Sequence, residues 1–316
     1  MSIPILLNAL PGAVAQGLIW GIMAIGVYVT FRVLDIADLT VDGTMCTGGA
    51  VCIMMMLSGH NVIVSLIVAT LAGMAAGLIT GIFHTFMGIP AILAGILTQL
   101  ALYSINLKIM TKANQSISVD QYDLLVSLRN VRGVPLFQNT LLIVALFIVV
   151  LIIVLYWIFG REIGCALRAT GCNENMARAQ GINTNLNKVL GLMISNGLVG
   201  LSSALLAQYQ GFADVNMGRG AIVIGLAAVI IGEAIFSKIF RNFALHLLAV
   251  VLGSIIYYLV LQVVILMGVD TDMLKLLTAV VVGIFLAIPF WKSKYFSKFG
   301  KRPQEIKRGG NTNAGN

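Results

Sequence analysis

Long apolar stretches separated by short polar ones run along almost the whole chain. A helix that crosses a bilayer needs about 20 mainly apolar residues. The stretches that meet or approach this length lie at 8–31, 43–58, 61–83, 88–109, 138–160, 187–208, 219–236, 243–267 and 273–291. Because the second and the seventh are short, the pattern predicts about nine transmembrane helices, within a range of eight to ten.

Composition supports a membrane protein and excludes two other classes. Hydrophobic residues make up 59% of the chain, charged residues only 10%, and the mean hydropathy is +0.97. Soluble proteins carry roughly 25% charged residues, and disordered chains carry few apolar ones. The chain has only six prolines, and its apolar stretches lack the polar–apolar alternation of a membrane β-barrel. We therefore expect an all-α, polytopic membrane protein.

The positions of lysine and arginine predict orientation and domain limits. Residues 292–316 carry seven positive residues against one glutamate, which is typical of a cytosolic flank. We expect this segment to be a disordered basic tail that touches anionic lipid and no nucleic acid, after a transmembrane domain at 1–291. Counting back nine spans places 160–187 in the cytosol, with the N-terminus and the 110–137 loop outside. The predicted location is the plasma membrane, with a cytosolic C-terminus.

The cytosolic loop has the signals of two short capped helices. We expect a helix over Glu162–Thr170 that Gly171 ends in a left-handed conformation. Asn173 is a suitable N-cap for a second helix over 174–180, which Gly181 can end. This second helix is either an amphipathic helix on the membrane surface or a rigid projection that docks on a cytosolic partner.

The same loop carries a resemblance to a known family. Its residues match the pattern G-x-A-x-R-A…A…G-I-N at Gly164, Ala166, Arg168, Ala169, Ala177 and 181–183. This pattern resembles ABC importer permeases of the branched-chain amino acid and ribose family, and the order of features extends the resemblance over nearly the whole chain. The segment LDIADLTVDGT (34–44) is most similar to the subgroup for tryptophan- or tyrosine-type uptake. GEAIFSKIF (232–240) departs from the family's usual glycine-rich turn.

The resemblance implies that this loop docks on an ATPase. The residues that would make the contact are Arg168, Glu174, Asn175, Met176, Ala177, Arg178, Gln180 and Gly181. It also implies two ATPase subunits that carry ATP and Mg²⁺, a second copy of the permease, and an external substrate-binding protein. The chain itself has no G-x-x-x-x-G-K-[ST], G-x-S-x-G or H-E-x-x-H motif, so we expect neither an enzyme nor a bound cofactor.

An acidic break follows the first apolar stretch. Arg32, Asp35, Asp38 and Asp42 lie within eleven residues, where charges need water, a cation or each other. One interpretation is a solvated loop in which Arg32 pairs with Asp35. A second, favoured by the resemblance, is a broken helix that lines a pore. A third is the magnesium cluster of an intramembrane prenyltransferase, for which only Asp270 and Asp272 remain as a second acidic site.

Several other polar positions lie inside or beside the predicted spans. Intramembrane amides such as Asn106 more often join helices than bind substrate. Glu233 is expected to pair with Lys238 or Arg241, and Arg219 either binds a carboxylate or anchors at the headgroups. Glycines spaced by four at 73, 77 and 81 predict close helix packing. The candidate residues of a translocation path are Asp35, Asp38, Thr40, Asp42, Gly43, Thr44, Gln99 and Asn196.

The predicted function is therefore the permease subunit of an ATP-driven ABC importer. The cargo implied by the resemblance is an amino acid, and more narrowly an aromatic one. An ion-coupled secondary transporter, with Asp35, Asp38 or Asp42 as the coupling carboxylate, is the alternative, followed by the prenyltransferase. The four cysteines lack a CxxC spacing, so no metal site or disulfide framework is predicted.

Overall fold

The computed structural model describes residues 3–118, 122, 124–131, 139–236, 240, 242–266, 273, 276, 278–280, 282–284 and 287. Its long helices are α1 (Ile3–Tyr28), α2 (Thr40–Leu57), α3 (Val62–Thr85), α4 (Ala91–Met110), α5 (Thr140–Phe159), α8 (Thr184–Gln210) and α10 (Phe243–Leu266). All seven are apolar and long enough to cross a bilayer, and α9 (Ala221–Phe236) is a shorter apolar helix. These eight correspond to the first eight predicted stretches, which confirms a polytopic helical protein. The predicted stretch at 273–291 lies largely, and the tail at 292–316 wholly, outside the described residues.

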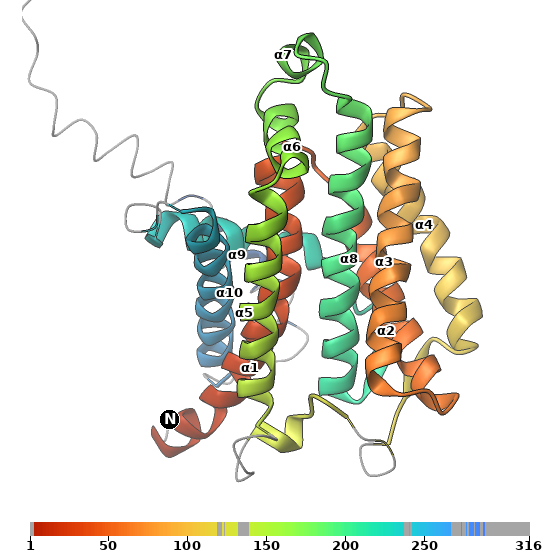
Figure 1. The fold of residues 1–316 in the computed structure, drawn as a ribbon. Coiled ribbons are helices and arrows are strands. Elements are labelled where there is room, and N and C mark those ends of the chain that lie inside the picture. The colour runs from red at the N-terminus through yellow and green to blue at the C-terminus, as the bar shows by residue number, and fades with distance from the viewer. Residues whose placement is uncertain are drawn as a thin grey trace, which may run out of the picture.

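The short elements lie between these helices. A π-helical turn, η1 (Val29–Val33), extends α1, and a 3-10 turn, η2 (Leu128–Val131), precedes α5. The helices α6 (Glu162–Cys172) and α7 (Glu174–Ala179) lie together at one end of the bundle, opposite the N-terminus (Figure 1).

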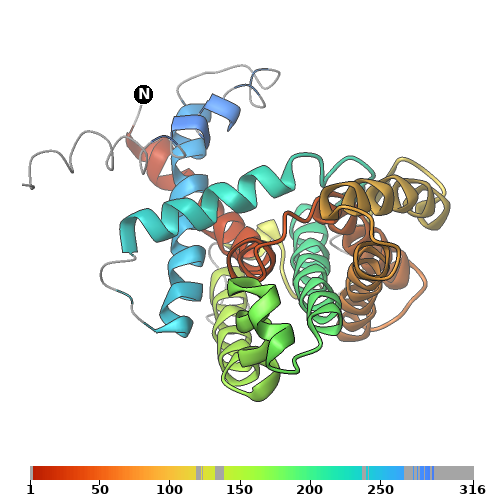
Figure 2. The same ribbon diagram turned by 90° about the horizontal axis from the view of Figure 1, so that it is seen from above.

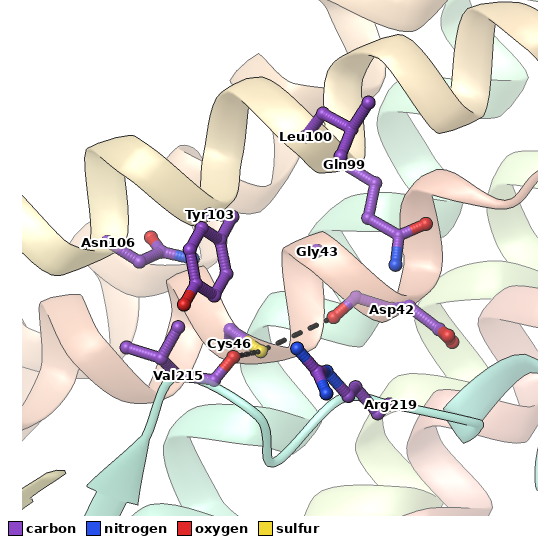
Figure 3. Close-up of a pocket in the computed structure, with 9 residues that line it drawn as sticks. All are labelled: Asp42, Gly43, Cys46, Gln99, Leu100, Tyr103, Asn106, Val215 and Arg219. Carbon is purple, nitrogen blue, oxygen red and sulfur yellow. Dashed lines mark hydrogen bonds between the residues drawn. The ribbon is translucent and has the colours of Figure 1, made fainter. Parts of the chain in front are cut away.

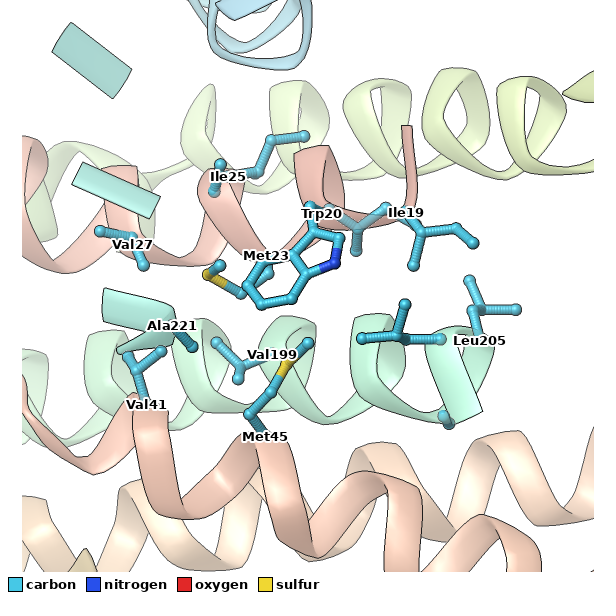
Figure 4. Close-up of a cluster of buried hydrophobic side chains, with 14 of the residues drawn as sticks. Ile19, Trp20, Met23, Ile25, Val27, Val41, Met45, Val199, Leu205 and Ala221 are labelled. Atoms are coloured by element: carbon cyan, nitrogen blue, oxygen red, sulfur yellow. The ribbon is translucent and has the colours of Figure 1, made fainter. Parts of the chain in front are cut away.

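The centre of the bundle consists of α1, α2 and α8. Side chains of α1 such as Trp20 and Met23 pack against Met45 of α2 and Val199 of α8, and Ala221 of α9 closes the cluster (Figure 4). The helices α4 and α5 are the most exposed spans, and their outward faces are apolar. Such faces suit lipid or another apolar surface. Seen from above, α9 lies across α10 (Figure 2).

The predicted glycine contact between helices is confirmed. A Cβ at Gly73 or Gly77 of α3 would collide with the carbonyl oxygen of Asn196 or Leu192, both on α8. A Cβ at Gly200 of α8 would in turn come within 2.8 Å of the carbonyl oxygen of Ala69 on α3. The absent side chains let the two helix backbones approach closely, as small residues do in membrane helix pairs.

One feature departs from an all-helical fold. Two three-residue strands, β1 (Asn114–Ser116) and β2 (Phe212–Asp214), pair antiparallel, with Gln115 opposite Ala213. They join the loop after α4 to the loop after α8, at the end of the bundle opposite α7. Hydropathy did not predict this ladder because neither strand is apolar or long.

Candidate coupling loop and translocation site

The helices α6 and α7 are capped partly as predicted. The side-chain oxygen of Asn173 accepts a hydrogen bond from the backbone N–H of Met176 over 3.0 Å, and Gly181 ends α7 with φ +80°. The expectation for Gly171 was wrong, since α6 continues to Cys172 and Gly171 is not left-handed. A Cβ at Gly171 would instead collide with the carbonyl oxygen of Val33, so this glycine brings α6 against η1.

Charged side chains fasten α7 to the start of α8. Glu174 pairs with Arg178 and with Lys188, each at 2.7 Å, and accepts a hydrogen bond from the hydroxyl of Thr184 over 3.3 Å. The hydrogen bond from Lys188, with the positive charges of Lys188 and Arg178, lowers the pKa of Glu174 below its ordinary value. The second helix is therefore anchored although it has only six residues.

Residues of the predicted docking set divide between the surface and the interior. Met176 is 64% exposed, and Asn175 and Gln180 are also exposed. Ala177 is buried within the chain, so it supports α7 from beneath and does not form part of its outer face. Arg168 donates to the carbonyl oxygen of Phe159 over 2.9 Å, at the C-terminal end of α5.

Two more apolar side chains are exposed around α7. Ile163 on α6 and Leu186 on α8 lie at this end of the bundle, near Met176 in the chain. Neither was expected from the sequence, because each is a single apolar residue in a polar segment.

In the acidic break between α1 and α2, Arg32 has a different partner from the predicted one. Arg32 donates to Glu233 over 2.8 Å, so the expected Arg32–Asp35 pair is not what the structure shows. The expected partners of Glu233 were Lys238 and Arg241. Both Lys238 and Arg241 lie outside the described residues. Asp35 is exposed and has φ +58°, at the turn where the chain reverses after η1.

Asp38 lies inside the bundle, and both of its carboxylate oxygens accept a hydrogen bond. One carboxylate oxygen accepts from the backbone N–H of Thr40 over 2.9 Å, and the other accepts from the side-chain amide of Asn196 over 2.7 Å. Thr44 donates to the amide oxygen of Asn196 over 2.7 Å. Four predicted path residues therefore form one buried polar cluster at the start of α2.

Two threonines that the sequence analysis did not select extend this cluster. The hydroxyls of Thr40 and Thr80 share a hydrogen bond of 2.7 Å, and Thr80 donates to Thr98 over 2.9 Å. The network thus joins α2, α3, α4 and α8. Threonine is common in membrane helices, and single positions at 80 and 98 carry no local signal for such a contact.

Asp42 accepts hydrogen bonds from the backbone at the start of α9 and does not belong to this cluster. Its two carboxylate oxygens accept hydrogen bonds from the backbone N–H groups of Gly220 and Ile222, each over 3.0 Å. An anion at a helix N-terminus is favourable because the N–H groups there lack partners within the helix. Asp35, Asp38 and Asp42 therefore lie in three different environments. The described residues contain no group of acidic, cysteine or histidine side chains that could hold a metal ion.

A cavity of about 380 Å³ lies beside Asp42, between α2, α4 and the loop before α9 (Figure 3). Gly43 and Gln99 are its other predicted path residues. Cys46 donates to the carbonyl oxygen of Val215 over 2.9 Å, which holds that loop on α2. The full lining is Asp42, Gly43, Cys46, Gln99, Leu100, Tyr103, Asn106, Val215 and Arg219.

Comparisons with known proteins agree with this architecture. The family model described as the permease component of a branched-chain amino acid transport system matches residues 10–289. The chain is 37% identical over 281 residues to a tyrosine transport system permease protein of Clostridioides difficile, which covers 89% of this chain and 91% of that protein. It is also 37% identical over 285 residues to an uncharacterised protein of Rickettsia prowazekii, covering 89% and 98% of the two chains.

More distant matches point the same way. The autoinducer 2 import system permease protein LsrC of Yersinia pseudotuberculosis is 27% identical over 184 residues, which is 55% of this chain and 48% of that protein. The solved structure of PsaBC from Streptococcus pneumoniae in complex with Fab has the same fold, with a TM-score of 0.54 and 18% identity over 94% of this chain and 100% of the other. Because the family match spans almost all the helices described above, this chain belongs to the family of branched-chain amino acid transport permeases, and is an ABC importer subunit without a catalytic site of its own.

Proposed function

We propose that two copies of this chain form the path of a plasma-membrane importer for an amino acid, most specifically one with an aromatic side chain. ATP hydrolysis takes place on partner ATPase subunits, as in the family. We also propose an external substrate-binding protein that delivers the cargo. The tyrosine permease relative, at 37% identity, supports the aromatic cargo.

The distribution of charge supports a cytosolic location for the α7 end. Arg161, Arg168, Arg178 and Lys188 all lie in or beside α6 and α7, and Arg32 lies in η1 at the same end of the bundle. Positive residues concentrate in cytosolic loops of membrane proteins. The β1–β2 ladder then faces the outside, together with the N-terminus.

The observation that carries the proposal is the anchored, protruding α7. A helix of six residues is not stable alone, because nucleation is unfavourable. The Asn173 cap and the ion pairs of Glu174 give it a fixed shape while Met176 and Gln180 stay exposed. A small rigid helix with an exposed apolar side chain suits a groove on an ATPase.

The same loop contacts the interior of the bundle. The backbone of α6 touches η1 at Gly171, and the amide of Asn187 donates to Thr170 over 3.3 Å, which links α6 to α8. From η1 the chain leads directly to Asp38 and its bond with Asn196. A displacement of α7 can therefore reach the polar cluster. The ATPase must bind two states of the permease with unequal affinity to drive this change.

The family assignment removes the two alternative functions. The prenyltransferase requires a cluster of carboxylates around Mg²⁺, whereas Asp38 and Asp42 bond to different helices in separate places. The ion-coupled transporter needs no ATPase, whereas the family is one of ABC permease components.

Docking is tested by substitutions on two matched methionines. Met176 and Met87 are each 64% exposed at the same end of the bundle, and Met87 lies between α3 and α4. We expect Met176→Arg to abolish co-purification of the ATPase and Met87→Arg to leave it unchanged. Equal retention of the ATPase by both variants would contradict a docking role for α7.

Cargo is tested by uptake into proteoliposomes that contain this chain, its ATPase and its binding protein. We expect uptake of labelled L-tyrosine to need ATP and all three components. Uptake driven by a proton or sodium gradient, with the ATPase left out, would refute the importer mechanism. Uptake of ribose without any of an amino acid would refute the cargo alone.

A further inference from the structure

Asn106 is a buried amide that has no hydrogen-bonding partner among the described residues. Its residue exposure is 0%, and neither atom of its side-chain amide is bonded within the part of the chain that the structure describes. Asn196 is equally buried, yet its amide makes bonds with Asp38, Thr44 and the carbonyl oxygen of Leu192. A buried polar group left unbonded costs about 1–3 kcal/mol, so it requires an explanation.

Arg219, in the same cavity wall, has an exposed side chain. No hydrogen bond or ion pair joins its guanidinium to the described residues, although it lies in a loop otherwise tied to α2 by Asp42 and Cys46. A guanidinium offers a planar fork of donors that matches a carboxylate. The cavity wall therefore contains a cation, Arg219, and an amide, Asn106, that have no bonded partners among the described residues.

The charges and the amide lie toward different ends of the cavity. Asp42 and Arg219 lie near one end, and Tyr103 and Asn106 near the other (Figure 3). Each carboxylate oxygen of Asp42 accepts one backbone N–H and retains a free lone pair for a further donor. The volume of about 380 Å³ lies at the lower end of the roughly 300–1,000 Å³ of small-molecule sites.

We propose that this cavity is an amino acid binding site within the permease itself. Arg219 binds the carboxylate and Asp42 the ammonium group of the zwitterion. Leu100 and Tyr103 contact its side chain, and Asn106 hydrogen-bonds to a polar group at the far end, such as a phenol hydroxyl. This inference rests on the proposed function for the class of cargo, and adds where and by what groups the permease recognises it.

The test measures binding of labelled L-tyrosine to the permease–ATPase complex in nanodiscs, with the binding protein left out. We expect Arg219→Gln to weaken tyrosine binding at least tenfold, because a charge-assisted pair is lost. L-tyrosinamide, which lacks the carboxylate, should compete poorly with labelled L-tyrosine for binding to the wild-type complex. Lys112→Gln removes an exposed cation at the same end, outside the cavity, and should bind as the wild type does.

Asn106→Leu tests the far end of the proposed site, and its thermal stability shows whether the variant is folded. Leucine has nearly the shape of asparagine, and the amide has no bond to lose within the described part of the chain, so thermal stability should be unchanged or higher. We expect about tenfold weaker binding of L-tyrosine, with L-phenylalanine binding unchanged.

Two outcomes overturn the inference. One is tyrosine binding within twofold of wild type in both cavity variants, and the other is a complex that imports tyrosine yet does not bind it at millimolar concentration. Either result leaves the proposed function standing, since uptake is measured separately. Failure of uptake for every amino acid tested would refute the proposed function, and this site with it.

Discussion

Asn196 on α8 donates its side-chain amide to the carboxylate of Asp38 over 2.7 Å, which joins the middle of one helix to the break before another. The bond spans 158 residues of sequence. It lies at the centre of the buried cluster that also contains Thr40, Thr44 and Thr80. The break after α1 is therefore held from inside the bundle.

We predict that Asn196→Leu destabilises the protein by about 1–3 kcal/mol, because one oxygen of the buried Asp38 carboxylate and the buried hydroxyl of Thr44 lose their bonds to the amide. Thermal unfolding of the purified protein measures the effect. Asn106→Leu is the matched control, since that amide is equally buried but unbonded. Equal changes in melting temperature for both variants would contradict the importance of the Asp38–Asn196 bond.

Gly171→Ala should separate ATPase docking from transport. A Cβ at this position would meet the carbonyl oxygen of Val33, so α6 must move away from η1. We expect the ATPase still to co-purify, since α7 is unchanged, while uptake falls at least tenfold because displacement of α7 no longer reaches η1. Gly12→Ala is the control, because the nearest atom to its Cβ would be the hydroxyl of Tyr209 at 3.7 Å. Wild-type uptake by Gly171→Ala would exclude this contact as a route.

The anchoring of α7 should depend on pH through Glu174. Its pKa is lowered in the folded protein, first by the hydrogen bond from Lys188, so its stabilising effect is present above the ordinary value of 4.5. The effect is lost as the pH falls through the lowered folded-state pKa. At neutral pH, Glu174→Gln should increase hydrogen exchange in 174–181 relative to the wild type.

The same comparison at low pH is the control. As the pH falls through the lowered pKa of Glu174, the difference between wild type and Glu174→Gln should shrink, because the wild-type side chain becomes neutral too. A difference that persists unchanged to the lowest pH at which the protein stays folded would show that charge is not the cause.

The ion pair between Arg32 and Glu233 should contribute little to stability. The side chains are 59% and 23% exposed, and partly exposed pairs are worth at most about 1 kcal/mol. A double-mutant cycle with Arg32→Gln and Glu233→Gln measures the coupling through unfolding temperatures. A coupling of several kcal/mol would mean that lipid or a partner subunit shields the pair from water.

Features determined by neighbours in sequence could be predicted from the sequence. The first eight apolar stretches match helices because hydropathy acts on each segment separately. Asn173 and Gly181 limit α7 as expected, since a cap bonds within three residues and a left-handed turn depends on one residue's backbone. Docking of α7 on an ATPase stays a prediction.

Contacts between distant helices were decided only by the tertiary structure. Arg32 has a nearby carboxylate at Asp35, yet pairs with Glu233, 201 residues away. Gly171 looked like a helix end and instead brings two backbones together. Asp38 and Asp42 looked like one acidic cluster, but the reversal after η1 directs one into the bundle and the other to the start of α9. Sequence determines which segments enter the membrane, because transfer into lipid is favourable for each apolar stretch independently of the others. The partner of each polar side chain depends on how the helices pack, so only the tertiary structure decides it.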